Sequence, residues 1–244
     1  MTNTSTSSSV VYDDFSGPEL DTAKWTFLEY PFPNVHLCAE PNAQVAVGNG
    51  AYSVRIERFE NEHGVQIIDN PKHLVYSKTT FPLPDHGVAS FSVKMAAQGI
   101  GTAPFDYRDG FAAFNVLDLV NGWVFDLAAS SEHIFAIHER LHLPGVHNPF
   151  THCVEAPLSG LDSTPGREHT YTISLDTAAG AVTWEVDGRT VYHLPGAILP
   201  SQVQVGFGIF TLHPVVNERS VSLHGQGFDV TWRDLRIDMT GTAR

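Results

Sequence analysis

The sequence predicts an all-β protein built as an antiparallel β-sandwich, and three observations support this fold class. Apolar and polar residues alternate with a period of two over many short segments, which is the pattern of half-buried strands. Gly and Pro contribute 20 and 15 of the 244 residues and interrupt these segments every few positions. No segment shows the 3.6-residue period of a long amphipathic helix. Many short strands joined by turns are typical of two packed sheets.

The predicted strands follow one another along nearly the whole chain. They are expected at residues 51–58, 74–81, 87–94, 111–119, 123–129, 134–143, 171–175, 182–186, 190–192, 203–211 and 228–237. Asp187-Gly188 is a turn signal within a three-strand meander over residues 168–193. The Ser/Thr-rich residues 1–9 are expected to be a disordered tail, and residues 10–240 are expected to form a single domain.

Composition excludes several classes of partner. The formal net charge is −13, from 14 Lys and Arg against 27 Asp and Glu, and no basic cluster occurs, so we expect neither nucleic acid nor a membrane as partner. No apolar run approaches the ~20 residues of a membrane span, and the amino terminus lacks the pattern of an export signal, which predicts a cytoplasmic protein.

Cys38 and Cys153 form neither a disulfide framework nor a metal-binding pair. We expect a monomer or a homodimer.

Three segments carry recognisable motifs. Residues 168–193 read EHTYTISLDTAAGAVTWEVDGRTVYH, with a His-Thr-Tyr triplet, a central Trp and a Val-Asp-Gly turn. Residues 12–25 read YDDFSGPELDTAKW, in which Phe15 and Trp25 would anchor the chain to a sandwich, and residues 87–94 read GVASFSVK. Together these segments resemble the concanavalin A-like lectins and glucanases, in particular the laminarinase and lichenase type glycoside hydrolases. The resemblance implies a concanavalin A-like jelly roll.

The same resemblance bears on catalysis. In the hydrolytic members a strand of the concave sheet carries Glu-x-Asp-x-x-Glu, because retaining glycoside hydrolysis uses two carboxylates about 5–5.5 Å apart. The corresponding strand here is WVFDLAA over residues 123–129, so Asp126 takes the place of the central Asp, whereas Val124 and Ala129 stand where the two Glu would be. The resemblance therefore disfavours a β-glucan hydrolase. It leaves a structural calcium open, with Asp14 and Asp234 as candidate ligands.

Strand parity suggests partners for Asp126. A tight hairpin at Ser130-Ser131 would pair residue 126 with about residue 136, which puts Asp126, His138 and Arg140 on one face. A carboxylate fixes the tautomer of a neighbouring imidazole, and an imidazole titrates near neutral pH. We expect these three residues to be catalytic, with a structural ion pair as the alternative.

Six further residues are expected to bind the substrate. Loops held by a rigid scaffold often carry sites, and the candidates are Tyr30 from the Pro-rich loop 29–36, Tyr107 and Arg108 from the charged segment 105–110, Asn115, Trp123 and His142. Arg108 has an alternative, an ion pair with Asp106 or Asp109 in a self-satisfied turn. Residues 144–157 are expected to be a long loop of the kind that forms lids.

Neither a metal nor a cofactor is expected for the chemistry. His138 and His142 would lie about 13 Å apart along a strand, too far to share one ion. The chain also lacks a Gly-rich nucleotide-binding loop.

Two main classes of function follow. The first is an enzyme that transforms a small, largely apolar or aromatic molecule in the concave cleft by cofactor-independent acid–base catalysis, as a cyclase, isomerase, lyase or hydrolase. Apolar residues beside Asp126 favour this class. The second is a carbohydrate-binding domain of lectin type, supported by fold resemblance alone. A glycoside hydrolase with rearranged carboxylates is a third alternative.

Overall fold

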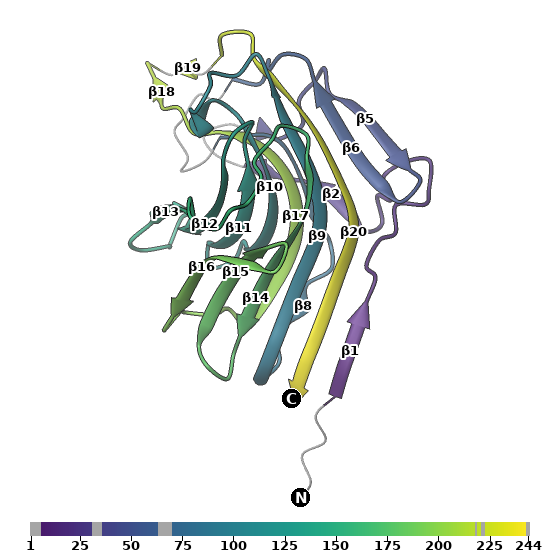
Figure 1. Ribbon diagram of the computed structural model, residues 1–244, viewed down its shortest axis with the longest axis vertical. Helices are drawn as coiled ribbons and strands as arrows, with labels where there is room; N and C mark the ends of the chain where they lie inside the picture. Colours follow the sequence, from purple (N-terminus) through teal and green to yellow (C-terminus); the bar gives the residue numbers. More distant parts are fainter. Residues whose placement is uncertain (1–5, 31–35, 63–69, 218, 221–222, 243–244) are drawn as a thin grey trace, which may run out of the picture.

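The computed structural model describes residues 6–30, 36–62, 70–217, 219–220 and 223–242. Two antiparallel sheets form the molecule, and Figure 1 shows them as two layers packed face to face. The first, sheet A, contains β1 (Thr6–Val10), β5 (Gln44–Gly48), β6 (Ala51–Ile56), β9 (His86–Ile100), β14 (Glu168–Asp176), β15 (Ala181–Val186), β16 (Arg189–Pro195) and β20 (Gly227–Thr242). The second, sheet B, contains β2 (Trp25–Phe27), β7 (Asn70–Ser77), β8 (Phe81–Pro82), β10 (Phe111–Asp118), β11 (Trp123–Ala129), β12 (Ile134–Arg140), β13 (Phe150–Glu155) and β17 (Gln202–Thr211).

The strand order explains how distant segments meet. Sheet A has the order β16-β15-β14-β9-β20-β6-β5, with β1 beside β20, and sheet B has the order β13-β12-β11-β10-β17-β7-β2, with β8 beside β17. Two small hairpins complete the strands: β3 (Glu29–Tyr30) with β4 (His36–Leu37), and β18 (Val215–Val216) with β19 (Arg219–Ser220). The only helix among the residues that the structure describes is the short 3-10 helix η1 (Tyr107–Asp109). None of the described residues belongs to a helix that could span a bilayer.

The core lies between the two sheets and confirms the predicted sandwich. Period-two alternation sends one set of side chains from each sheet inward, where large aromatic rings dominate. Trp25, Tyr52, Phe207 and Trp232 are buried and contact one another in a chain of rings 5.1–6.1 Å apart. Phe15 stacks on Trp25 at 6.0 Å, so the opening motif does anchor the chain as predicted.

The His-Thr-Tyr and Val-Asp-Gly motifs meet in one turn of sheet A. The Nδ1 atom of His169 lies 2.6 Å from Asp187 Oδ2, and its Nε2 atom lies 2.7 Å from the carbonyl oxygen of Asp162. The backbone N–H of Thr170 donates to Asp187 Oδ1 at 2.8 Å. The imidazole therefore ties β14 to the β15–β16 turn, and both motifs are structural.

Two predicted segments differ from the structure. Residues from Thr6 onward form β1 and pair with β20, so the expected disordered tail is wrong for residues 6–9, because the Ser/Thr backbone completes an edge of sheet A. The expected loop 144–157 contains β13, which pairs with β12 from Phe135↔Glu155 to Arg140↔Phe150. The sequence of β13, FTHCVE, does not alternate strictly between apolar and polar residues, and its side chains do not alternate between buried and exposed. The period of two therefore does not predict this strand.

Candidate functional site

The candidate site lies on the face of sheet B that points away from sheet A, here called the outer face. Phe125 and Leu127 of β11 pack into the inter-sheet core, so period two places Val124 and Asp126 on the outer face. The surrounding outer face is apolar and buried, and its cluster consists of Cys38, Leu74, Phe111, Ala113, Ala128, Phe135, Ile137 and Phe210. Ala129 points into the inter-sheet core. Neither Val124 nor Ala129 can supply a carboxylate, as the sequence predicts.

Two buried carboxylates share this apolar face. Asp126 is 2% exposed, and the amide nitrogen of Asn115 on β10 donates to its Oδ2 atom at 2.6 Å. Glu139 on β12 is 1% exposed, and the hydroxyl of Thr151 on β13 donates to its Oε1 atom at 2.5 Å. Asp126 pairs with Ile137, and Glu139 pairs with Val124, so the two acids are diagonal neighbours on adjacent strands. The outer face therefore has a carboxylate pair, but not in the expected sequence pattern.

The space beside Asp126 is small and otherwise apolar. A cavity of about 20 Å³ lies against Asn115 and Asp126, and its other walls are Leu28, Leu74, Leu117, Leu119, Val124, Leu141 and Phe210. This volume suffices for about one water molecule. Tyr107 covers another part of the outer face, with its ring 5.0 Å from that of Phe135. Tyr107, Asn115 and Asp126 thus belong to one face of sheet B.

The predicted cluster of Asp126, His138 and Arg140 is wrong. The β11–β12 hairpin has the four-residue turn 130–133, closed by a hydrogen bond from the N–H of Ser130 to the carbonyl of His133, and residue 126 pairs with 137 rather than 136. A shift of one residue moves a side chain to the opposite face of a sheet. His138 and Arg140 therefore lie on the inner side of β12, and Glu139 occupies the outer face beside Asp126.

The other predicted site residues are dispersed. Arg108 is bound to its neighbour, with Nε 2.8 Å from Asp106 Oδ1, which is the self-satisfied turn given as its alternative. Trp123 lies on the inner side with His138, at a ring distance of 5.8 Å. His142 is exposed beyond the end of β12. Tyr30 ends β3, and its side chain, like the rest of the predicted aromatic loop at 31–35, lies outside the described residues.

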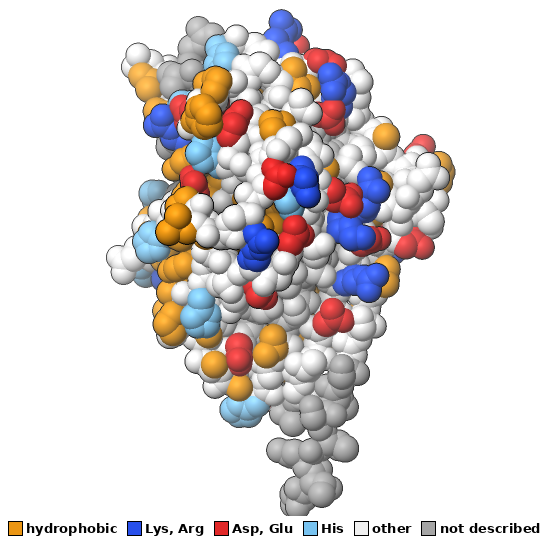
Figure 2. Space-filling model, viewed as in Figure 1, with side chains coloured by type: hydrophobic (Ala, Val, Ile, Leu, Met, Phe, Trp, Pro, Cys, Tyr) orange, Lys and Arg blue, Asp and Glu red, His pale blue; other side chains and the backbone are white. Residues whose placement is uncertain are grey.

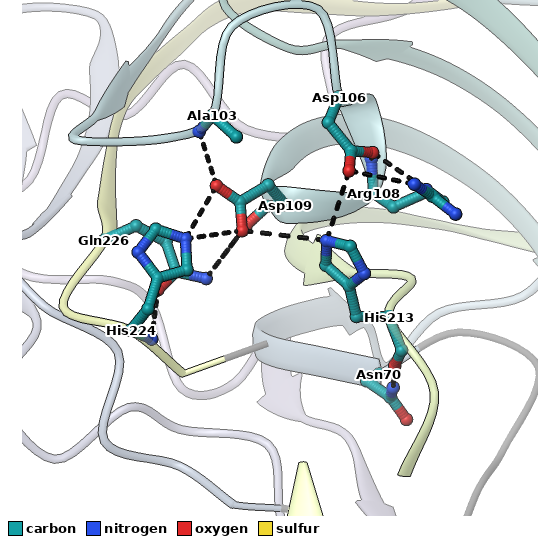
Figure 3. A network of polar contacts seen from close by, with 8 residues as sticks. All are labelled: Asn70, Ala103, Asp106, Arg108, Asp109, His213, His224 and Gln226. Carbon is teal, nitrogen blue, oxygen red and sulfur yellow. Dashed lines mark hydrogen bonds and ion pairs between the residues drawn. The ribbon is translucent and has the colours of Figure 1, made fainter. Parts of the chain in front are cut away.

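A second polar cluster, around Asp109, was missed by sequence reasoning. Figure 3 shows Asp109 between two histidines that come from distant segments. Asp109 is 1% exposed, and its carboxylate lies 2.8 Å from His224 Nε2 and 3.8 Å from His213 Nε2. It also accepts hydrogen bonds from the N–H of Ala103 and the amide nitrogen of Gln226. His224 and Gln226 are more than 100 residues from Asp109, so no local pattern could reveal this cluster.

The Asp109 cluster is well satisfied and joins three segments: η1, the end of β17 and the start of β20. His213 Nε2 also lies 3.4 Å from Asp106 Oδ2, and the hydrogen bonds of Arg108 hold the pKa of Asp106 below its ordinary value. A buried carboxylate with this many donors is held in place and orients the half-exposed imidazole of His224. The cluster therefore has a structural role, because it holds these three segments together at one end of sheet B.

One buried lysine lies at the start of β7. Lys72 is fully buried, and its Nζ atom donates to the carbonyl of Asn61 at 2.7 Å. Burial lowers the pKa of Lys72 to about 8, although the charge of Glu40 acts in the opposite direction. Burial in turn raises the pKa of Glu40, against hydrogen bonds from the backbone N–H groups of Glu60 and Asn61. This network pins the segment around Asn61 to β7.

The two carboxylates that the resemblance offers as calcium ligands, Asp14 and Asp234, have protein partners. Asp14 accepts a hydrogen bond from the N–H of Ser16 at 3.1 Å, and Asp234 forms an ion pair with Lys94 at 2.7 Å. Across the described residues, no group of three or more His, Cys, Asp or Glu side chains is arranged to hold a metal ion.

Comparison with solved structures identifies the fold. The endo-1,3-beta-glucanase from Streptomyces sioyaensis aligns with a TM-score of 0.57 and 15% identity over 96% of each chain. Porphyranase B from Zobellia galactanivorans aligns with a TM-score of 0.59 and 12% identity over 99% of this chain and 96% of that chain. The endo-beta-1,3-glucanase from Pyrococcus furiosus gives a TM-score of 0.57 and 14% identity, covering 95% and 94%.

These similarities confirm the concanavalin A-like jelly roll that the motifs implied, and at these identities they establish the fold alone. No curated protein sequence matches the chain at a significant level. A family model described as "Family of unknown function (DUF6081)" matches residues 12–241. The match spans most of the 244 residues, and the chain therefore belongs to this family.

Proposed function

We propose that this protein is a cofactor-independent enzyme that transforms a small, largely apolar or aromatic molecule at the outer face of sheet B. The observation that carries the proposal is the pair of buried carboxylates, Asp126 and Glu139, within an apolar face. Buried carboxylates are uncommon unless they are hydrogen-bonded or functional. The reaction would be a proton transfer of the kind used in isomerisation, elimination, cyclisation or hydrolysis.

The geometry suits acid–base chemistry. Diagonal neighbours on antiparallel strands have Cα atoms roughly 7–8 Å apart, which leaves room for a small reacting group between two carboxyl groups. One carboxylate can remove a proton while the other carboxyl group returns one. Asn115 and Thr151 each hold one of these carboxylates by a hydrogen bond, so both acids are oriented before a substrate binds.

The apolar walls indicate the class of substrate. Leucine side chains from Leu28, Leu119 and Leu141 line the cavity next to Asp126. Since the cavity holds about one water molecule, a substrate reaches the carboxylates when these side chains move apart. A molecule with apolar groups compensates for that opening by burying its own surface, at about 25 cal/mol per Å².

A generic proton-abstraction substrate tests the proposal. Base-promoted ring opening of 5-nitrobenzisoxazole removes a C–H proton and breaks the N–O bond, and the product is a coloured cyanophenolate. We expect the protein to accelerate this reaction over an equal concentration of acetate, and the Asp126→Asn or Glu139→Gln variant to lower the rate by about 10²-fold or more, as for loss of a general base.

Glu185→Gln is the matched control, because Glu185 lies on β15 in sheet A, away from the outer face of sheet B. This variant should keep the full rate. No acceleration over acetate at any pH at which the protein is folded, or equal rates in all four proteins, would refute the proposal.

A glycoside hydrolase or transglycosylase with rearranged carboxylates is the second candidate. It is favoured by the same carboxylate pair, because glycosidases use two carboxyl groups between about 5 and 9.5 Å apart. The fold neighbours include glucanases and a transglycosylase. Release of reducing sugar from laminarin that disappears in Asp126→Asn and Glu139→Gln would select this candidate, whereas the first proposal predicts no release.

A further inference from the structure

His138, Arg140 and Trp123 form a second cluster on the inner side of sheet B, at the edge where β12 and β13 face β15 and β16. The His138 ring lies nearly parallel to Trp123 at 5.8 Å and to Phe125 at 5.7 Å. Phe150 of β13 contacts it edge-on at 5.0 Å, and Trp184 of sheet A lies 6.0 Å away. The imidazole is thus enclosed by four aromatic rings, and it is 7% exposed.

Several polar atoms in this cluster are buried without a partner. Among the described residues, nothing hydrogen-bonds to His138 Nδ1 or Nε2, Arg140 Nε or Trp184 Nε1. Burial, helped by the neighbouring His152, lowers the pKa of His138 to about 4, so near neutral pH the ring offers one donor and one acceptor. A buried polar group without a partner destabilises the fold. These atoms belong to side chains of one contacting cluster, since Trp184 lies 6.0 Å from His138 and Arg140 lies over Trp123, and such unsatisfied groups are accounted for where a polar ligand group binds.

The positive charge of Arg140 favours an anionic ligand at this cluster. Its guanidinium lies 4.9 Å from the centre of the Trp123 ring, and within the described ranges it forms no ion pair. Several arginines of this chain have carboxylate partners, for example Arg55 with Asp229 at 2.6 Å and Arg233 with Glu168 at 3.0 Å. Arg140 is half-buried in a chain with a net charge of −13, and an anionic ligand would give it a counterion.

The surroundings require the ligand to have an apolar part as well. Figure 2 shows hydrophobic and histidine side chains gathered along the left edge of the view, over β13 and β16, whereas most of the Lys and Arg side chains visible in this view lie over sheet A. Phe150 is half-buried at this edge, and His152 is exposed beside it. The planar fork of an arginine binds a carboxylate with two parallel hydrogen bonds.

We propose that Arg140, His138 and Trp123 form a binding site for a small aromatic carboxylate, separate from the carboxylate pair on the outer face. The carboxylate group binds the Arg140 guanidinium, and the ring packs against Trp123 and Phe150. His138 orients the bound carboxylate with its donor nitrogen. The site lies on the opposite side of β12 from Glu139, so the two sites share a strand but no side chain.

Benzoate is the probe, and benzamide is its neutral counterpart. We expect saturable benzoate binding by calorimetry, with shifts of the Trp123 and Trp184 indole N–H signals in NMR spectra, and at least about tenfold weaker binding of benzamide. Arg140→Met should weaken benzoate binding at least about tenfold, and Arg140→Lys should give an intermediate affinity because it lacks the fork.

Two variants serve as controls. Arg167→Met removes an exposed arginine that is paired with Asp162, and it should leave benzoate binding unchanged. Asp126→Asn should also leave it unchanged, which separates this site from the proposed catalytic face. Absence of saturable binding, equal binding of benzoate and benzamide, or full affinity in both Arg140 variants would overturn the proposal. If Arg140→Met does not fold, the Arg140→Lys variant alone decides.

Discussion

At the residue scale, the position of Glu139 shows what the sequence could and could not reveal. Asp126 was identified from the motif resemblance, and its burial among apolar side chains follows from the residues around it. Which residue of β12 lies beside Asp126 on the same face depends on the length of one turn. The hydroxyl of Ser130 accepts hydrogen bonds from the N–H groups of Glu132 and His133, and these bonds stabilise a four-residue turn. Pairing Asp126 with residue 136 would require a turn with an odd number of residues. With such a turn His138, rather than Glu139, would lie on the same face as Asp126.

The buried histidines give a pH prediction at this scale. Burial lowers the pKa of both His73 and His138 from 6.5 to about 4. Below pH 6.5 these histidines therefore bind protons in the unfolded chain, whereas in the folded chain they stay neutral down to about pH 4. The free energy of unfolding is therefore highest above pH 6.5 and decreases as the pH falls toward 4, by at most about 1.4 kcal/mol per pH unit for each histidine.

Replacing His138 with Phe should keep the ring stack and remove its titration. Urea unfolding at pH 7 and pH 5 should show a smaller loss of stability for His138→Phe than for the wild type. The exposed His142, replaced in the same way, is the control and should follow the wild type. An identical loss in His138→Phe and in the wild type would mean that this imidazole is not held neutral by the fold.

At the element scale, the alternating segments and the meander at residues 168–193 were predicted well, whereas the register of the β11–β12 hairpin and the pairing of distant strands were not. The strand at 123–129 is found with the predicted bounds, because alternation and flanking turns are local signals. β7 begins four residues before the predicted strand, since Asn70 and Lys72 are polar residues that the fold buries. The Asp109 cluster joins three elements whose proximity is a property of sheet order. A local sequence pattern does not show which distant strands become neighbours in a sheet.

The close pairing of β9 with β20 leads to a prediction for Gly87. This residue pairs with Gly241, and a Cβ atom at Gly87 would collide with the carbonyl oxygen of Thr240 in the facing strand. Because backbone cannot move aside cheaply, Gly87→Ala should lower the free energy of unfolding by about 1–3 kcal/mol in urea denaturation. At Gly17 the nearest atom to a new Cβ is 3.5 Å away, so Gly17→Ala is the control and should be nearly neutral. Equal stability of the two variants would contradict the close approach of β9 and β20 at Gly87.

At the scale of the whole molecule, the sandwich itself was the most predictable property. Period-two alternation and dense turns fix the class, because a strand with one apolar face must pack that face against another layer. The jelly-roll motifs then place the opening segment and the β14–β16 meander. The outer face of sheet B is where the chain departs from the resemblance: leucine and phenylalanine side chains cover it, and the second carboxylate, Glu139, comes from β12, a strand that the motif does not describe.

Net charge gives the prediction that belongs to the whole molecule. The 27 acidic side chains outnumber the 14 basic ones, and most ion pairs in the described residues are exposed, so each adds at most about 1 kcal/mol. Raising the salt concentration from about 0.01 M to 0.15 M shortens the screening length from roughly 30 to 8 Å. Repulsion among the excess carboxylates then weakens more than the short ion pairs do. We therefore expect NaCl to raise the melting temperature at pH 7, by about 2–4 °C for each kcal/mol of repulsion removed. Sucrose at equal osmolality controls for effects of water activity, and a melting temperature that falls with added NaCl would show that the surface ion pairs outweigh the net charge.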